Sequence, residues 1–283
     1  VIRVLDSSGA ELSLKALGLE EDQFKLYEEA ISKPYGMILV TGPTGSGKTV
    51  SLYSALSTLN SPEVNISSVE DPIEINVPGI NQVAINERAD LTFAVALRAF
   101  LRQDPDIVMV GEIRDLETAD IAVKASQTGH LVLSTLHTND APSTVVRLLN
   151  MGVEPFNVAS SVHLIMAQRL VRKLCSQCRQ PAKHPDEALI RAGFSPGPEI
   201  GEIKIYGPGG CDECTGGYKG RTGIFQVMPV TEAISTMILR DAGQDAIEKQ
   251  MTLEGVLSLR QAGLKKVRAG ITSLEEVLRV TGS

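Results

Sequence analysis

The chain has 283 residues, of which 43% are hydrophobic and 22% are charged, and this balance excludes disordered and fibrous proteins. At roughly 150 residues per domain, the length predicts about two structural units. With 27 basic against 34 acidic residues, a formal net charge of −7 and 4% aromatic residues, the chain lacks the basic surface and the stacking rings of a nucleic-acid binder, so we expect no nucleic-acid partner.

The first residues predict a remnant followed by a helix. Residues 1–5 alternate like the end of a strand, and the chain starts without methionine, so we expect 1–15 to be the remnant of a preceding N-terminal domain. Apolar residues then recur at helical spacing over 20–32, and Pro34 ends that helix.

Short apolar strands alternate with helices in the next part of the chain. The expected strands are 37–41, 65–69, 107–110 and 130–136, and the expected helices are 48–58, 91–102, 116–128 and 141–150. Continuous apolar strands separated by helices are typical of a sheet covered on both faces, so we predict an α/β core with a mainly parallel sheet. Since no apolar run approaches the length of a membrane span and no apolar signal sequence is visible, we expect a cytoplasmic chain without direct membrane insertion.

The composition changes after about residue 174, where proline and glycine become frequent. From 229 onward the pattern is helical, and Ser273-x-x-Glu276 predicts a capping box at the start of the last helix. We therefore expect an α/β core over 16–174, a four-cysteine element over 175–228 and a helical C-terminal subdomain over 229–283.

A glycine-rich segment lies between the first predicted strand of this core and the helix that follows. It fits the phosphate-loop pattern G-x-x-x-x-G-K-[ST], in which backbone N–H groups and a helix N-terminus face phosphate oxygens. We expect Lys48 to reach the β- and γ-phosphates and the Thr49 hydroxyl to ligate Mg²⁺. The expected nucleotide-binding residues are Gly42, Pro43, Thr44, Gly45, Ser46, Gly47, Lys48, Thr49 and Val50.

Polar residues follow the other predicted strands. An acidic segment with Glu70 and Glu74 follows the second strand, and Glu112 follows the third. The carboxyl ends of parallel strands meet at one edge, so we expect these groups to converge on the phosphate loop, although single loop acids are often merely solvated. His137 follows the fourth strand and is placed to sense the γ-phosphate, whereas His130 precedes that strand and is as consistent with a structural role.

Glu112 is our candidate for the base that orients the attacking water. Gly111 occupies the position where a magnesium-binding aspartate usually stands. Thr49 is therefore the only direct protein ligand that we expect for Mg²⁺, with waters held by Glu112 and by acids such as Glu70 and Glu74.

The four cysteines form two C-x-x-C pairs separated by 32 residues: Cys175, Cys178, Cys211 and Cys214. Four thiolates so arranged suit a closed tetrahedral Zn²⁺ site, which is structural because it leaves no position open for water. Two redox dithiols or four unpaired thiols are the alternatives, but redox motifs are typical of a βαβ helix start and these pairs lie in turn-rich sequence. We expect zinc to shape a module too short to have its own core.

Four segments resemble, in chain order, the signature motifs of the secretion and type IV pilus ATPases of the RecA-like superfamily. They are the phosphate loop 42–49, the acidic box 69–74, the run 101–115 and the histidine box 128–139. The resemblance extends over nearly the whole chain, and the glycine at position 111 is itself a feature of that family. Segments 79–83, 139–142, 148–152 and 270–278 most resemble the pilus assembly (extension) branch. The type II secretion branch is the close alternative, and the retraction branch lacks the four-cysteine element.

The resemblance implies a homohexameric ring that holds ATP between an N-terminal domain and this one. Hydrolysis would move the two domains and pass the motion to an inner-membrane platform protein, with the motor cytoplasmic and peripheral to that membrane. The implied cofactors are ATP/ADP, Mg²⁺ and Zn²⁺. By motif match, the arginines near the phosphates would be Arg3, Arg98, Arg102, Arg114 and Arg221. From the residues alone, each is also consistent with an ordinary surface cation.

Three classes of function follow, in this order. The first is a Mg²⁺-dependent ATPase that performs mechanical work. The second is a nucleic-acid translocase with the same core, which the net charge of −7 disfavours. The third is a nucleotide-gated scaffold that binds without turnover, which would not need Glu112.

Overall fold

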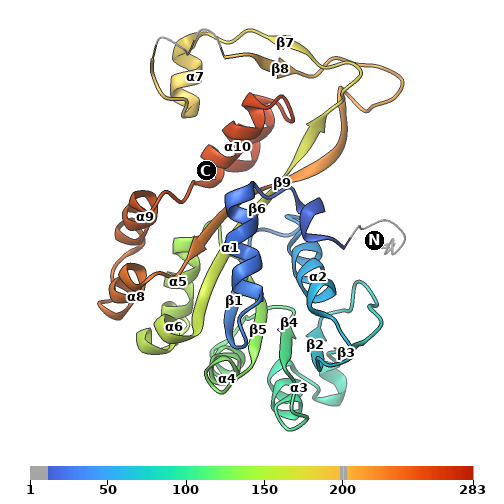
Figure 1. Ribbon diagram of the computed structural model, residues 1–283, viewed down its shortest axis with the longest axis vertical. Coiled ribbons are helices and arrows are strands. Elements are labelled where there is room, and N and C mark those ends of the chain that lie inside the picture. The colour runs from blue at the N-terminus through green and yellow to red at the C-terminus, as the bar shows by residue number, and fades with distance from the viewer. Residues whose placement is uncertain (1–11, 198–199, 201–202, 283) are drawn as a thin grey trace. The chain divides into compact units, whose positions relative to one another are not determined.

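The computed structural model describes residues 12–197, 200 and 203–282. Within these residues the chain divides into two compact units (Figure 1). The first unit contains the described residues up to Ala167 together with Val227–Val256, and the second contains Gln168–Gln226 and the described residues from Leu257 onward. The expected strand remnant at 1–5 and the candidate Arg3 lie outside the described residues.

The first unit alternates strands and helices as the sequence predicts. Its elements up to β5 are η1 (Leu14–Leu17), α1 (Glu21–Ile31), β1 (Gly36–Thr41), α2 (Lys48–Leu59), β2 (Ile66–Glu70), β3 (Ile80–Ala84), η2 (Glu87–Ala89), α3 (Phe93–Phe100), β4 (Ile107–Val110), α4 (Leu116–Gln127) and β5 (Leu131–Leu136). The later ones are α5 (Ala141–Asn150), α6 (Pro155–Ser161), α8 (Glu232–Leu239) and α9 (Gln244–Leu253), and the strands β6 (Val162–Leu174) and β9 (Tyr218–Pro229) extend from this unit into the second.

The main sheet has seven strands in the order β3-β2-β4-β5-β1-β6-β9. The pairs β2–β3, β2–β4, β4–β5, β5–β1 and β1–β6 are all parallel, which confirms the predicted α/β core. Every residue of β1, β2, β4 and β5 is buried, as expected for central strands covered on both faces. The register pairs Thr41 with Leu136, so β1 and β5 end side by side.

The connections between strands explain where a ligand can bind. The chain passes from β1 through α2 to β2, which lies nearer to β3 in the strand order. It passes from β4 through α4 to β5 in the opposite direction, toward β9. Because such crossovers are right-handed, α2 and α4 cover opposite faces of β1 and β5, which both helices contact. A crevice forms beyond the carboxyl ends of the strands where the direction of winding reverses, and the segment after β1 lies at this reversal.

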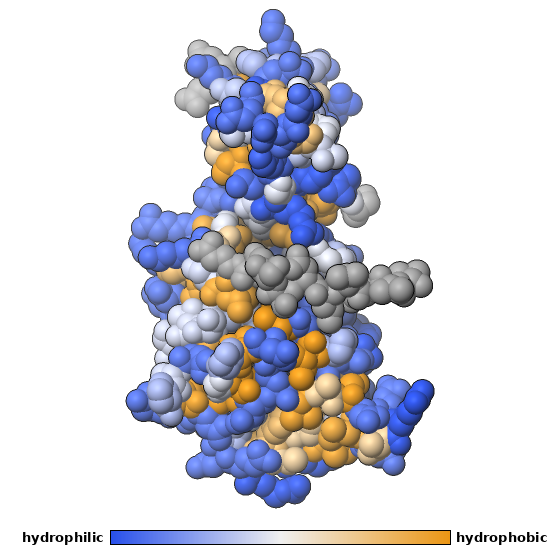
Figure 2. All heavy atoms as spheres, turned by 90° about the vertical axis from the view of Figure 1, so that its right-hand side faces the viewer, coloured by the Kyte–Doolittle hydropathy of each residue, from blue (hydrophilic) through white to orange (hydrophobic). Residues whose placement is uncertain are grey.

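Among the described residues, the edge strand β3 has a strand neighbour on one side only, and apolar side chains lie near it. Ile80 and Val83 of β3 are partly exposed, and Val95 of α3 is 45% exposed. Figure 2 views the side of the first unit on which β3 and α3 lie and shows apolar residues gathered there. An apolar surface next to an unpaired strand edge is typical of an interaction site.

The second unit combines the cysteine segment with the last two helices. Its elements are β7 (Gln180–Ala182), α7 (Asp186–Ala192), β8 (Ile205–Gly207), α10 (Leu259–Arg268) and α11 (Leu274–Thr281), with β7 and β8 antiparallel. Apolar residues between the two cysteine pairs pack with α10 and α11 in one core that includes Leu189, Phe194, Ile205, Leu264 and Val277. The segment between the cysteine pairs therefore shares an apolar core with α10 and α11.

The helical C-terminal subdomain expected at 229–283 is not one unit in the structure. Helices α8 and α9 belong to the first unit, where α8 contacts α6 and α9 contacts α5, whereas α10 and α11 belong to the second. The helical region divides after Val256, in the segment between α9 and α10, whereas the other two boundaries between the units fall within the long strands β6 and β9. No helix among the described residues has the length and apolar character needed to cross a membrane.

Candidate active site and cysteine cluster

The phosphate loop connects the buried end of β1 to the first turn of α2. Gly45 has φ 79° and Gly47, the N-cap of α2, has φ 89°, conformations that a residue with a Cβ adopts only under strain. Positive φ at both glycines lets the loop backbone turn its N–H groups toward an anion near the N-terminus of α2, as phosphate binding requires. Lys48 is buried, and its Nζ donates to the carbonyl oxygens of Gly42 at 2.8 Å and Pro43 at 3.3 Å.

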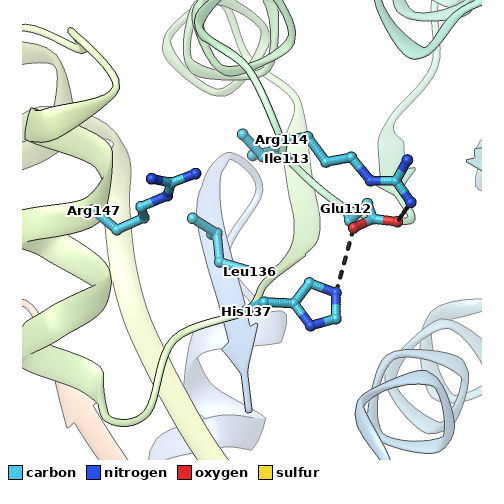
Figure 3. Close-up of a pocket in the computed structure, with 6 residues that line it drawn as sticks. All are labelled: Glu112, Ile113, Arg114, Leu136, His137 and Arg147. Carbon is cyan, nitrogen blue, oxygen red and sulfur yellow. Dashed lines mark hydrogen bonds and ion pairs between the residues drawn. The ribbon is translucent and has the colours of Figure 1, made fainter. Parts of the chain in front are cut away.

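Glu112 lies just past the end of β4 and faces two basic side chains (Figure 3). Its carboxylate accepts a hydrogen bond from Arg114, and its Oε2 lies 3.3 Å from Nε2 of His137. Arg114 also approaches Asp71 of the acidic box at 3.7 Å. The structure thus brings together the ends of β2, β4 and β5, as the sequence predicts.

The surroundings of Glu112 keep it ionised. Burial raises the pKa of its carboxyl, but the hydrogen bond from Arg114 and the positive charges of Arg114, His137 and Lys48 outweigh that effect, so the pKa lies below its ordinary value of 4.5. A carboxylate at this position can accept a proton or a hydrogen bond from water at neutral pH.

A chain of hydroxyl groups fixes His137 relative to the phosphate loop. Thr41, which immediately precedes Gly42, accepts a hydrogen bond from the backbone N–H of Thr138 at 3.0 Å, and the two hydroxyls lie 2.6 Å apart. The Thr138 hydroxyl in turn lies 2.6 Å from that of Thr144 in α5. His130 lies at the amino end of β5, and its Nδ1 is 3.0 Å from the carbonyl oxygen of Ala125 in α4, a contact that is consistent with a structural role.

Glu70 is enclosed in a buried network rather than placed at the crevice. It accepts hydrogen bonds from the hydroxyls of Tyr53 and Ser68 and from Nε2 of Gln82, and it is 4% exposed. Burial and the Glu70 carboxylate raise the pKa of Tyr53. Gln82 also donates to the carbonyl oxygen of Ile75 at 2.9 Å, so the network anchors the acidic loop. The sequence did not identify Tyr53 and Gln82 as partners of Glu70.

The remaining candidates lie in different places. Glu74 is partly exposed in the loop after β2. Arg98 of α3 pairs with Glu117 of α4 at 2.7 Å, with both side chains about half exposed. Arg221 is exposed on β9 within the second unit.

Arg102 lies in a turn just after α3. This turn is at the amino ends of the strands, whereas the phosphate loop is at their carboxyl ends. Asn65, the residue before β2, donates from Nδ2 to the carbonyl oxygens of Gln103 at 3.0 Å and Asp104 at 3.1 Å. This turn therefore lies at the amino ends of β2 and β4, and the structure does not bring Arg102 to the site of its own chain.

A cavity of about 400 Å³ opens beside Glu112 and is lined by Glu112, Ile113, Arg114, Leu136, His137 and Arg147. Figure 3 shows the Arg147 side chain extending from α5 toward this cavity. Arg147 was not among the site residues expected from the sequence. The sequence contained a signal for this residue. The helix that begins four residues after His137 has a single charged residue, and that residue is Arg147.

The four cysteines are brought together in the second unit. All four Sγ atoms lie within 4.8 Å of one another, with Cys175–Cys211 at 3.9 Å and Cys178–Cys214 at 3.6 Å. Thiolates arranged tetrahedrally around Zn²⁺ at about 2.3 Å would be separated by about 3.8 Å. The cysteines are free rather than disulfide-bonded, and their donor set and spacing fit Zn²⁺.

Comparison with known proteins gives a family match over the length of the chain. The model of the family described as type II/IV secretion system protein matches residues 1–279. The type IV pilus assembly ATPase PilB of Pseudomonas aeruginosa is 59% identical over 281 residues, 99% of this chain and 50% of that protein. The type II secretion system ATPase E of Vibrio cholerae is 51% identical over 282 residues, 99% of this chain and 55% of that protein. The chain thus spans about half the length of the curated relatives it matches.

Solved structures have the same fold. The pilus retraction motor PilT with bound ADP gives a TM-score of 0.71 at 28% identity, covering 96% of this chain and 67% of that one. The Legionella pneumophila ATPase DotB gives a TM-score of 0.69 at 21% identity, covering 96% of this chain and 66% of that one. At this identity the likeness shows the fold alone.

Proposed function

This chain belongs to the type II/IV secretion system protein family, and we propose that it is the ATP-hydrolysing part of a motor that powers type IV pilus assembly. The observation that carries the enzymatic proposal is the Glu112–His137 pair, which lies at the same sheet edge as the phosphate loop. The proposal of pilus assembly rests on the 59% identity with a protein named for that role.

In this proposal the loop residues 42–50 hold the phosphates of ATP, and Lys48 exchanges its loop carbonyl partners for phosphate oxygens. The Thr49 hydroxyl is the direct protein ligand for Mg²⁺, which supplies charge neutralisation at the phosphates. Glu112 orients the attacking water, and Arg114 and His137 hold its carboxylate in place. The assignment of Glu112 is supported by its two basic neighbours and by its position at the sheet edge that holds the phosphate loop.

The other predicted site residues receive different roles. Glu70 acts through the network with Tyr53 and Gln82, as an anchor for the acidic loop. Glu74, in that loop, remains a candidate to hold a magnesium-bound water. Arg98 and Arg102 receive no role in the site of their own subunit, because the first is paired with Glu117 and the second lies at the opposite sheet edge.

We also propose a homohexameric ring that acts on an inner-membrane platform protein from the cytoplasmic side. Support comes from the family and from the apolar surface beside the edge strand β3. Zinc at the four cysteines is proposed as a structural ion of the second unit.

Type II secretion is the second candidate, favoured by relatives that are up to 51% identical. Complementation separates the two candidates. The full-length protein is expressed in one strain that lacks its pilus assembly ATPase and in another that lacks its type II secretion ATPase. Surface pili restored in the first strain, without secretion restored in the second, support pilus assembly, and the reverse result contradicts it.

The enzymatic proposal predicts that Glu112→Gln in the full-length protein lowers kcat for ATP hydrolysis by at least about 100-fold, because general-base catalysis contributes this much. Nucleotide affinity should change little, because the phosphate loop is untouched. The exposed Glu29→Gln in α1 is the matched control. Steady-state hydrolysis and equilibrium nucleotide binding are the measurements, and normal turnover in Glu112→Gln would refute the assignment.

A further inference from the structure

The cavity beside Glu112 has an excess of positive charge. Two arginines and one glutamate line it. Arg114 is already paired with Glu112 and Asp71. Among the residues that the structure describes, the Arg147 guanidinium has no hydrogen bond or ion pair. Arg114 is therefore engaged by two carboxylates, whereas the guanidinium of Arg147 is the partnerless cation of the described cavity lining.

Helix α5 holds Arg147 in this position. Its buried side includes Ala141, Val145 and Leu148, and a capping box formed by Asp140 and Ser143 fixes its first turn. Arg147 lies on the opposite, exposed side of the helix, where it extends toward the cavity (Figure 3). The anchored helix fixes the backbone from which this side chain extends, so only the side chain itself has to become ordered when it binds a ligand.

The cavity adjoins the place where hydrolysis would occur. Glu112 and His137 form one of its walls, and both face the position that we propose for the attacking water. Its volume of about 400 Å³ is ample for a small oxyanion. The planar guanidinium presents paired N–H donors that match phosphate oxygens.

We infer that this cavity receives the inorganic phosphate released by hydrolysis and that Arg147 binds it. The inference rests on the proposed ATPase function and deepens it. ATP and water yield ADP and phosphate, and Arg147 takes no part in bond making or breaking. Its role is to attract the product away from the phosphate loop while ADP is still bound.

The test measures phosphate binding without turnover. Full-length protein is saturated with ADP, so that the phosphate loop is filled, and titrated calorimetrically with inorganic phosphate at constant ionic strength. Arg147→Gln should weaken phosphate binding about tenfold, as expected for the loss of a hydrogen bond to a charged group. Arg147→Lys should retain part of the affinity, and the exposed Arg240→Gln should match the parent protein.

A kinetic measurement provides the second readout. Inhibition of ATP hydrolysis by added phosphate should require about tenfold more phosphate in Arg147→Gln, with an unchanged melting temperature because the side chain is exposed. Equal phosphate affinity in Arg147→Gln and the parent protein would overturn the inference. Absence of ATP hydrolysis by the parent protein would instead overturn the proposed function, because the ADP-state titration requires no turnover.

Discussion

Two glutamates that follow neighbouring strands differ in their surroundings. Glu70 is the last residue of β2 and lies between β3 and β4, so its carboxylate is enclosed by neighbouring side chains. Glu112 stands two residues beyond the end of β4 and is partly exposed. Both carboxylates have protein partners, but only that of Glu112 is exposed enough to meet water.

We predict that Tyr53→Phe destabilises the first unit by about 1–3 kcal/mol, because it removes a donor from a buried carboxylate. Tyr27→Phe is the matched control, since Tyr27 is equally buried but donates to the backbone carbonyl oxygen of Ser51 at 3.2 Å. That change should cost only about 1 kcal/mol. Native-state hydrogen exchange of β2 and β3 measures both effects, and equal losses would contradict the anchoring role of Glu70.

The last helix, α11, is anchored by one buried glutamate. Glu276 is 1% exposed and accepts hydrogen bonds from Arg172 of β6 and from Arg279 one turn later. Burial raises the pKa of Glu276, but the hydrogen bonds from Arg279 and Arg172 outweigh it and lower the pKa to about 2. The carboxylate therefore joins β6 to α11 within the second unit.

This lowered pKa predicts an acid-labile second unit. The folded pKa of about 2 lies below the ordinary value of 4.5, so the stabilising contribution is complete above about pH 4.5 and is lost as the pH falls toward 2. Glu276→Gln should remove that dependence and cost on the order of 2 kcal/mol at neutral pH. Hydrogen exchange of α11 amides against pH is the measurement. The exposed neighbour Glu275→Gln should leave the profile unchanged, and an unchanged profile in Glu276→Gln would contradict the prediction.

At the scale of the whole molecule, the catalytic candidates and the cysteine cluster lie in different units. The phosphate loop, Glu112 and His137 belong to the first unit, and the four cysteines belong to the second. Metal removal and nucleotide binding can therefore be tested separately.

We predict that the purified protein contains one equivalent of Zn²⁺ per chain and that a strong chelator destabilises the second unit. Hydrogen exchange should rise around the cysteines and in α10 and α11, whereas ADP affinity should change little. Cys211→Ser should reproduce the loss, and Ser176→Ala, in the turn between the first two cysteines, is the control. Metal analysis that finds no zinc, with four thiols freely reactive in the native protein, would exclude the site.

Much of the core was predictable because it depends on local pattern. The eight strands and helices expected between 37 and 150 are all present, with α5 and β4 matching at both ends. Strand β3 was missed because its residues are only partly buried at the sheet edge, which weakens the apolar signal. Strands β6 and β9 were missed because they contain many polar residues and cross from one unit to the other.

The sequence by itself was enough to predict the phosphate loop, the grouping of the four cysteines and the parallel core, and to make Glu112 a candidate for the catalytic base. Each of these follows from residue types at fixed spacing, since glycine geometry, thiolate chemistry and strand burial are local properties. Only the tertiary structure shows that Glu70 is enclosed, that Arg102 lies at the amino ends of the strands and that Arg147 lines the cavity. Those outcomes depend on contacts between segments far apart in the chain, because the neighbours of a side chain are set by how strands pair and helices pack.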